Sequence, residues 1–242
     1  MRIGGDVTGT PLMKFYSATG SGALRAILAE PDFRKGAGDD ETYDLAIIGG
    51  GVSGVSAAIE AHRAGLNFIL FEATQVFSTV INFPKQKPIY TYPTGMTLDG
   101  GLQFTATVKE ALVQEMEAQR QAAGIEPTPA RIEQIDRDGD SLSLRHVEGE
   151  TTHARRVIVA IGRSGNFRKL DVPGEDLDKV SNRLFDPKEF AGKNALVVGG
   201  GDSALETAIA LTTSGAQVTL SYRKKELSRA KPENIRKVEA LV

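Results

Sequence analysis

The 242-residue sequence contains no cysteine. The chain therefore has no disulfide framework, no thiolate metal site and no redox-active dithiol of its own. It also lacks an apolar run of about 18 residues, the length that a membrane helix requires, and its first residues lack the apolar core of a signal peptide. We therefore expect a cytoplasmic protein without a membrane span.

A strong charge of one sign is also missing, because 29 basic residues nearly balance 31 acidic ones. The longest basic block is Arg223 to Lys225, which argues against nucleic-acid binding. The three histidines, His62, His146 and His153, are scattered and show no metal-ligand spacing, so no metal site is expected. Small molecules or proteins are the expected partners.

Glycine is clustered at residues 4–5, 49–51 and 199–201. Before the second cluster, residues 43–48 form an apolar run of strand length. After it, alanines recur at helical spacing up to residue 64, and residues 67–72 form a second apolar run. The pattern predicts a β-α-β unit around the second cluster.

Gly49, Gly51 and Gly54 fit the G-x-G-x-x-G pattern between the first run and the helix. In that context the first glycine permits a tight turn, the second lets a diphosphate approach the backbone, and the third lets the helix pack closely. Glu72 ends the second strand, where an acid binds a ribose hydroxyl. We interpret the unit as a dinucleotide site that includes Val52 and Ser53. A purely structural glycine turn is the alternative.

Less regular patterns separate the two glycine turns. Residues 77–100 read as an ordered loop, residues 102–123 as a helix and residues 130–155 as a small antiparallel meander. Residues 156–162 form a buried strand that ends at Gly162.

The β-α-β pattern recurs from residue 194 to residue 220, with Gly199 and Gly201 in its turn and Ala204 in place of the third glycine. No acid ends its second strand. Arg223 follows instead, and a guanidinium pairs well with the 2′-phosphate of NADPH. The alternative is that these residues only form a solvated basic surface, which comprises Arg223, Lys224, Lys225 and Arg229.

The ordered motifs together resemble the thioredoxin-reductase-like flavoproteins of the pyridine nucleotide-disulfide oxidoreductase family. They are Gly49 to Gly54, Val159 to Gly162, Val172 to Glu175, Gly199 to Ala204 and Tyr222 to Pro232. The last is most similar to the branch of bacillithiol-disulfide reductases and ferredoxin–NADP reductases. The resemblance implies an α/β fold with two Rossmann-like units of the three-layer ββα type, FAD at the first turn and NADPH at the second.

The sequence departs from that family in two features of its layout, the position of one segment and the length of the second unit. Residues 3–14 are similar to the segment that follows the NADPH domain in that family, whose aspartate contacts the flavin ribityl chain, and this similarity assigns that role to Asp6. An ordinary N-terminal extension is the alternative. The second unit is also short, so we expect a partial NADPH unit in a permuted or truncated chain.

The third departure is chemical, because the family's Cys-x-x-Cys pair is absent. What the resemblance then implies is hydride transfer from NADPH to FAD and electron delivery to an external acceptor, such as a ferredoxin-like iron–sulfur protein or a quinone. A non-catalytic flavoprotein fragment that needs a partner chain is the alternative. A flavin monooxygenase is disfavoured because no second motif of that class lies between the turns.

These observations predict four segments: residues 1–30 completing the FAD domain, a linker at 31–42, the FAD domain at 43–163 and the partial NADPH domain at 166–242. A homo-oligomer is expected, and no catalytic residue is assigned. The predicted cofactor contacts are Asp6, Gly49, Gly51, Val52, Ser53, Gly54, Glu72, Gly162, Gly199, Gly201, Asp202, Ser203, Ala204, Arg223, Lys224 and Arg229.

Overall fold

A computed structural model describes residues 1–4, 12–36, 41–162 and 169–241. The chain divides into two compact units. Unit 1 comprises Met1–Asn82 and Gln86–Leu170, and unit 2 comprises Phe83–Lys85 and Asp171–Val242. Each unit is described separately below.

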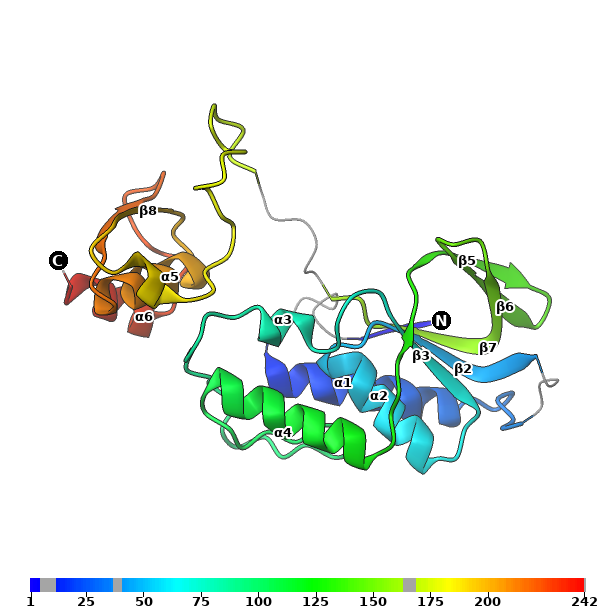
Figure 1. Ribbon diagram of the computed structural model, residues 1–242. Helices are drawn as coiled ribbons and strands as arrows, with labels where there is room; N and C mark the ends of the chain where they lie inside the picture. The colour runs from blue at the N-terminus through cyan, green and yellow to red at the C-terminus, as the bar shows by residue number, and fades with distance from the viewer. Residues whose placement is uncertain (5–11, 37–40, 163–168, 242) are drawn as a thin grey trace. The chain divides into compact units, whose positions relative to one another are not determined.

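The described part of unit 1 contains a seven-stranded sheet in the order β4-β3-β2-β7-β6-β5, with β1 also paired to β7 (Figure 1). β1, β2, β3, β4 and β7 form parallel pairs, whereas β5, β6 and β7 form an antiparallel meander, as the sequence predicted. The strands are β1 Arg2–Ile3, β2 Thr42–Ile48, β3 Phe68–Glu72, β4 Thr128–Pro129, β5 Ile132–Asp138, β6 Ser141–His146 and β7 Thr151–Val159.

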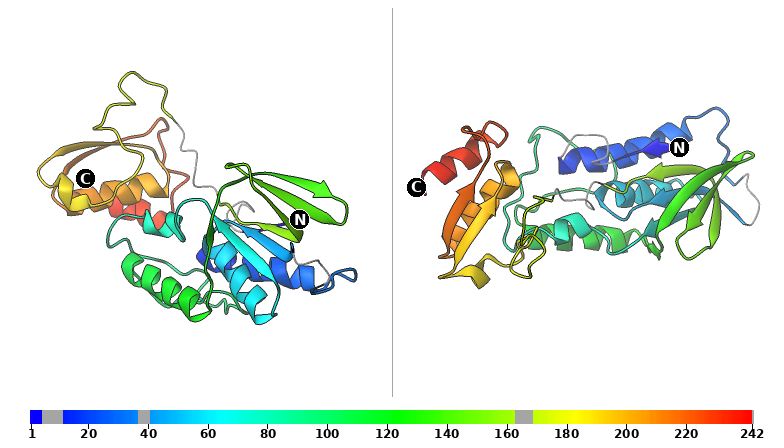
Figure 2. Two further views of the ribbon diagram at one scale, coloured as in Figure 1. Left: turned by 45° about the vertical axis from the view of Figure 1, so that its right-hand side comes forward. Right: turned by 90° about the horizontal axis from the view of Figure 1, so that it is seen from above.

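Both faces of the parallel part of the sheet are covered. Helices α1 Met13–Leu28, α2 Val52–Arg63 and α4 Lys109–Ala122 lie on one face, as the two views of Figure 2 show. On the other face, Leu144 of β6 packs with Ala46 of β2 and Phe71 of β3. Burial on both faces explains why β2 is a nearly continuous apolar run rather than an alternating one. The predicted three-layer α/β fold is confirmed.

Strand β7 joins the parallel and antiparallel parts. Its first residues pair with β6, and its last residues pair with β1 on the same side. Val159, at its end, is the partner of both Ile3 in β1 and Ile48 in β2. The carboxyl ends of these three strands therefore lie together, which is where ligands bind in open α/β sheets.

Helix α1 crosses α2 at unusually close range. A Cβ added to Gly20 would lie 2.0 Å from the carbonyl oxygen of Ser53, so only glycine permits this approach. Ser17 of α1 also accepts a hydrogen bond from Ser56 of α2 at 2.9 Å. The N-terminal segment is thus packed into the same unit as β2 and α2.

The structure corrects two predicted elements. The helix expected from Leu102 begins at Lys109, because the preceding backbone is bound elsewhere: the amides of Thr105 and Ala106 donate to Glu115 of α4. The predicted loop at residues 77–100 also contains a short helix, α3 Ser78–Ile81. At the start of α4, hydrogen bonds to the side chain of Glu115 decide the local structure.

Unit 2 contains a two-stranded parallel sheet within Asp171 to Leu241, the part that the structure describes. β8 Asn194–Val198 and β9 Gln217–Ser221 pack on helix α5 Asp202–Thr213, which also contacts α6 Pro232–Glu239 and the 3-10 helix η2 Pro187–Phe190. The opposite sheet face is open, since Leu196 is 66% exposed and Val198 is 47% exposed.

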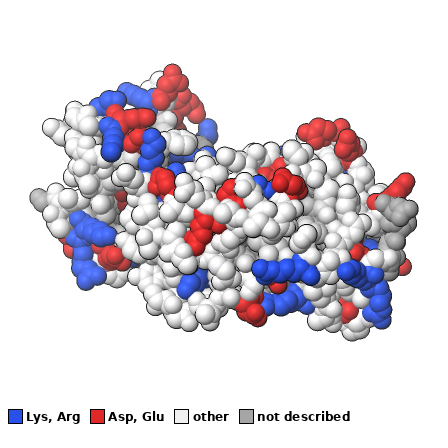
Figure 3. Space-filling view, turned by 60° about the horizontal axis from the view of Figure 1, so that its bottom comes forward, with Lys and Arg blue, Asp and Glu red and all other residues white. Residues whose placement is uncertain are grey.

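Basic and acidic side chains are interspersed on the face drawn in Figure 3, and neither sign forms one continuous patch there. This agrees with the nearly balanced charge of the sequence. Among the helices that the structure describes, none combines the length and apolarity needed to span a membrane.

Candidate functional site

The first glycine turn connects β2 to α2. Gly49 has a φ of 107°, a conformation that favours glycine. A Cβ on Gly54 would lie 1.8 Å from the carbonyl oxygen of Gly49, so the third glycine allows the helix to pack against the turn. A Cβ on Gly51 would meet no atom of the described residues within 4 Å. The backbone at Gly51 is therefore open to a ligand.

The amino end of α2 is the electropositive part of this turn. Its N-cap is Gly51, and no side chain caps the helix. The first amides of a helix have no acceptor within the helix, and together with the helix dipole they favour an anion. Val52 and Ser53 occupy the first helical positions and are buried.

Glu72 lies at the carboxyl end of β3, as predicted, and its carboxylate is hydrogen-bonded to the glycine turn. One carboxylate oxygen accepts a hydrogen bond from the Gly50 amide at 2.6 Å. The other accepts from the amide and hydroxyl of Thr74, at 2.8 and 3.1 Å. The carboxylate is thus held next to the turn, and part of its hydrogen-bonding capacity is used by the protein itself.

A pocket of about 440 Å³ opens beside Glu72. Thr74 and Phe77 line it from the loop after β3, while Glu117 and Arg120 line it from α4. The Phe77 amide donates to the carbonyl oxygen of Gly50 at 3.0 Å, which connects this wall to the glycine turn. The volume falls within the range of small-molecule sites.

Arg120 is a pocket residue that sequence reasoning missed. Its guanidinium donates to the carboxylate of Glu117 at 2.6 and 2.9 Å and to the carbonyl oxygen of Ile125. These hydrogen bonds lower the pKa of Glu117 and raise the pKa of Arg120. A signal was available, because Arg120 follows Leu112 and Met116 at four-residue spacing on the buried helix face, where a charge needs a partner.

The last described residue before Asp6 is Gly4, whose amide donates to the carbonyl oxygen of Val159 at 3.0 Å. A Cβ on Gly4 would lie 2.7 Å from the hydroxyl oxygen of Ser53. That hydroxyl is buried and has no hydrogen-bond partner among the described residues. Asp6 itself lies outside the described residues.

The segment after β7 forms another side of the turn. The Ala160 amide donates to the carbonyl oxygen of Ile48 at 2.8 Å, and a Cβ on Gly49 would lie 2.5 Å from the Ala160 oxygen. Gly162 has a φ of 65°, and a Cβ there would meet nothing within 4 Å in the part of the chain that the structure describes. The backbone at Gly162 is therefore as open as that at Gly51.

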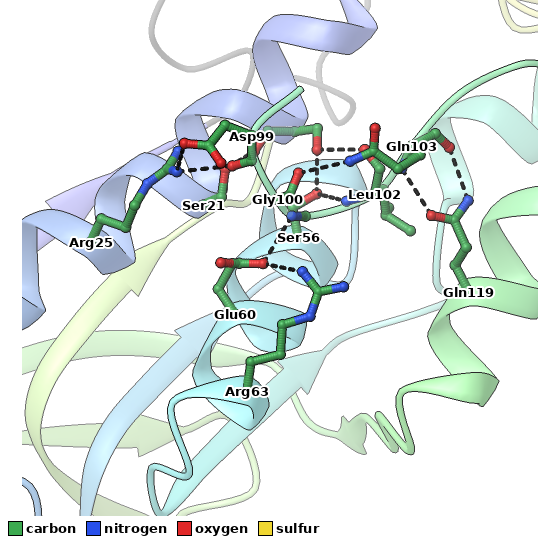
Figure 4. Close-up of polar contacts among 12 residues, drawn as sticks. Ser21, Arg25, Ser56, Glu60, Arg63, Asp99, Gly100, Leu102, Gln103 and Gln119 are labelled. Carbon is green, nitrogen blue, oxygen red and sulfur yellow. Dashed lines mark hydrogen bonds and ion pairs between the residues drawn. The ribbon is translucent and has the colours of Figure 1, made fainter. Parts of the chain in front are cut away.

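A polar network, buried where Ser17, Ser56 and Leu102 meet, fixes the loop at residues 99–103 to three helices (Figure 4). Leu102 donates through its amide to Ser56 at 3.2 Å and accepts from Ser17 at 2.8 Å. Glu60 of α2 accepts from the Gly101 amide, and Gln119 of α4 exchanges hydrogen bonds with the Gln103 backbone. This network holds α1 and α2 in fixed register behind the first glycine turn.

The second glycine turn repeats this geometry in unit 2. Gly199 has a φ of 147°, and a Cβ on Gly201, the N-cap of α5, would meet nothing within 4 Å. Ala204 replaces the third glycine, and its Cβ would lie 2.9 Å from a Cβ on Gly199. The ring of Tyr222 lies over the turn, 2.5 Å from a Cβ added to Gly200.

The remaining predicted contacts of unit 2 differ in their surroundings. Arg223, Lys224 and Arg229 are exposed, and Ser203 is exposed at the start of α5. Asp202 already has protein partners: its carboxylate accepts from the Lys231 amide and from the side chain of Asn234, both at 2.8 Å.

Comparison with known proteins decides the family. Residues 46–241 match the model of the pyridine nucleotide-disulphide oxidoreductase family. The chain belongs to this family. The resemblance inferred from the glycine turns and the segments between them is thereby confirmed.

Two curated members of the family illustrate the similarity. A ferredoxin–NADP reductase of Ignicoccus hospitalis is 32% identical over 182 residues, which cover 75% of this chain and 56% of the relative. The bacilliredoxin reductase Bdr of Bacillus subtilis is 27% identical over 81% of this chain and 62% of the relative. The chain thus spans less than two thirds of either relative.

Solved structures show the same relationship. The bacillithiol disulfide reductase Bdr from Bacillus cereus superposes with a TM-score of 0.73 at 26% identity, covering 83% of this chain and 65% of that protein. A thioredoxin reductase from Lactococcus lactis gives a TM-score of 0.61 at 25% identity, covering 82% and 61%. The name of the first structure agrees with the branch of the family that the sequence predicted.

Proposed function

We propose that this chain binds FAD at the first glycine turn and NADPH at the second. We propose further that it reduces the bound flavin with NADPH. The observation that carries the proposal is the paired turn geometry: each turn has a positive-φ glycine first and an open glycine at the amino end of a helix. Membership of an oxidoreductase family that uses pyridine nucleotides supports the same assignment.

The residues of unit 1 fit FAD. The open backbone at Gly51 and the uncapped end of α2 suit the diphosphate. Glu72 is held where a ribose hydroxyl can reach its carboxylate, and the pocket between Glu72 and Arg120 has room for an adenine. Gly4, at the joined strand ends, leads toward Asp6, which we propose as the ribityl contact.

The residues of unit 2 fit NADPH. The open Gly201 at the start of α5 suits the diphosphate, with Ser203 beside it. The exposed cations Arg223, Lys224 and Arg229 suit a 2′-phosphate, which NADH lacks. FAD held by the residues of unit 1 would supply the redox chemistry, namely hydride acceptance from NADPH and onward electron transfer.

The electron acceptor is proposed to be external, because the sequence contains no cysteine that could form a protein dithiol. A ferredoxin-like iron–sulfur protein is the proposed acceptor, supported by the similarity to a ferredoxin–NADP reductase. The cytoplasmic location and the homo-oligomeric state stay predictions from the sequence.

Anaerobic titration tests the proposal. The FAD-loaded chain is mixed with NADPH, and the flavin absorption band is followed. The band is expected to bleach, faster with NADPH than with NADH, and to return when oxidised ferredoxin is added. The Arg223→Ala variant is expected to show a smaller difference in rate between the two nucleotides, because it lacks one of the cations proposed for the 2′-phosphate.

A non-catalytic binding module is the second candidate. The open face of the two-stranded sheet in unit 2, with Leu196 66% exposed, favours it. A sheet this small is marginally stable by itself. This candidate predicts that FAD binds but that NADPH leaves the flavin band unchanged, which would contradict the proposed reduction.

A further inference from the structure

Four cations of unit 2 lie on one loop with fixed ends. We define the basic loop as residues 222–231, which connect β9 to α6 and include Arg223, Lys224, Lys225 and Arg229. These four side chains are exposed. A loop of long, exposed basic residues binds one phosphate selectively only if its backbone is held in place.

Both ends of the basic loop are attached to the second glycine turn. At its start, the ring of Tyr222 packs on Gly200 so closely that an added Cβ would lie 2.5 Å away. At its end, the amide of Lys231 donates to the carboxylate of Asp202 at 2.8 Å. Asp202 directly follows Gly201, so this second attachment is also made at the turn.

Asn234 strengthens the second attachment. It lies on α6, is 6% exposed, and donates through its side-chain nitrogen to Asp202 at 2.8 Å and to Glu206 at 3.3 Å. The same oxygen of Asp202 thus accepts from both Lys231 and Asn234. Because charged acceptors form the stronger hydrogen bonds, Asp202 is the main polar connection seen between α5 and the amino end of α6.

This arrangement gives Asp202 a role different from direct phosphate contact. Its carboxylate is engaged with α6, and a negative charge repels a diphosphate. We propose that Asp202 is a positioning residue for nucleotide selectivity: it holds the basic loop at a fixed distance from the turn that receives the diphosphate. The inference rests on the proposed binding of NADPH by unit 2.

The physical reason lies in the shape of the ligand. In NADPH the diphosphate and the 2′-phosphate are carried by one ribose, so their separation varies little. A turn and a basic loop joined by Asp202 match that fixed separation. Without the connection, the loop must become ordered before its cations reach the 2′-phosphate, and this ordering costs conformational entropy.

Binding of two small probes to the full chain tests the inference by calorimetry. The probes are 2′,5′-ADP and 5′-AMP, which differ only in the 2′-phosphate. The Asp202→Ala and Asn234→Asp variants are expected to lose about tenfold of the preference for 2′,5′-ADP, the size of one charge-assisted hydrogen bond. Asp202→Asn retains an acceptor oxygen and is expected to keep most of the preference.

Two controls isolate positioning from charge. Glu226→Ala removes an acid from the basic loop itself, so a pure charge effect would strengthen anion binding in this variant and in Asp202→Ala alike. Circular dichroism verifies that each variant is folded. The ratio of the two affinities is the readout, because general destabilisation lowers both affinities together.

The outcomes separate the two proposals. Selective loss in Asp202→Ala and Asn234→Asp, with recovery in Asp202→Asn, supports the positioning role. An unchanged ratio in these variants, or an equal loss of both affinities, overturns that role while the NADPH assignment stands. If the unchanged chain shows no preference and Arg223→Ala has no effect, the NADPH assignment fails and the positioning role fails with it.

Discussion

At the scale of single residues, Gly54 has the least room for a side chain among the glycines that the structure describes. A Cβ there would lie 1.8 Å from the carbonyl oxygen of Gly49, a backbone atom that cannot rotate away. We expect Gly54→Ala to destabilise the chain by about 1 to 3 kcal/mol, as overpacking does, and to weaken FAD binding by displacing α2 from the turn. Thermal unfolding and FAD titration measure both effects.

Gly22→Ala is the matched control. Gly22 also lies within a helix, but a Cβ there would meet nothing within 4 Å. Alanine favours a helix over glycine by about 0.5 to 1 kcal/mol, so this variant should be slightly more stable and should bind FAD normally. Equal behaviour of the two variants would contradict the packing role assigned to Gly54.

Some features of single residues could be predicted from the sequence, whereas others could not. The positive φ of Gly49 and the close contact at Gly54 were predictable, because the glycine pattern lies between a strand and a helix. The partners of Asp202 were not, since Lys231 and Asn234 follow it by about thirty positions and no local pattern connects them. Such pairs depend on how helices pack, which periodicity does not encode.

At the scale of elements, an ion-pair cluster joins the end of α1 to the sheet. Arg156 of β7 donates to Glu30 at 2.6 Å and to Asp32 at 2.8 Å, and Arg2 of β1 donates to Glu30 at 2.9 Å. The hydrogen bond from Arg156 is the main cause of the lowered pKa of Glu30. The ionised form of Glu30 therefore strengthens the connection between β1, the segment after α1 and β7.

Glu30→Gln tests this connection. Because the folded pKa of Glu30 lies below its usual value of 4.5, the stabilisation is fully present above that pH and is lost as pH falls through the folded pKa. The variant is expected to be less stable by about 1 to 2 kcal/mol at neutral pH, with the difference shrinking once the pH is brought below 4.5. Urea unfolding at both pH values measures it.

The exposed pair on the same helix provides the comparison. Arg25 contacts Asp99 at 2.6 Å, but the Asp99 side chain is 96% exposed, so Asp99→Asn should change stability little at either pH. A Glu30→Gln difference that stays constant from neutral to acidic pH would contradict the electrostatic explanation.

Element boundaries were less predictable than element types. The strands β2, β3, β8 and β9 follow from apolar runs and the meander from its turns. The start of α4 did not follow, because Glu115 binds the amides of Thr105 and Ala106 and keeps them out of the helix. The pairing of β1 with β7 joins residues more than 150 positions apart, and short strands carry little signal of their own.

At the scale of the whole molecule, the two similar glycine turns lie in two units whose sheets differ in size. Unit 1 surrounds its turn with a covered sheet, whereas unit 2 has a two-stranded sheet with one open face within the residues described. The sequence predicted a shorter second unit, because it shows only one β-α-β pattern there. The family match over residues 46–241 confirms the resemblance that suggested two nucleotide sites.

The most direct test of the account is calorimetric titration of the purified chain with FAD and with FMN, alongside its absorption spectrum. FMN lacks the adenosine and the second phosphate that the Gly51 backbone, Glu72 and the neighbouring pocket would receive. The account predicts a yellow chain that binds FAD stoichiometrically and far more tightly than FMN. A colourless chain that gives no heat with FAD, or binds both flavins equally, would contradict it.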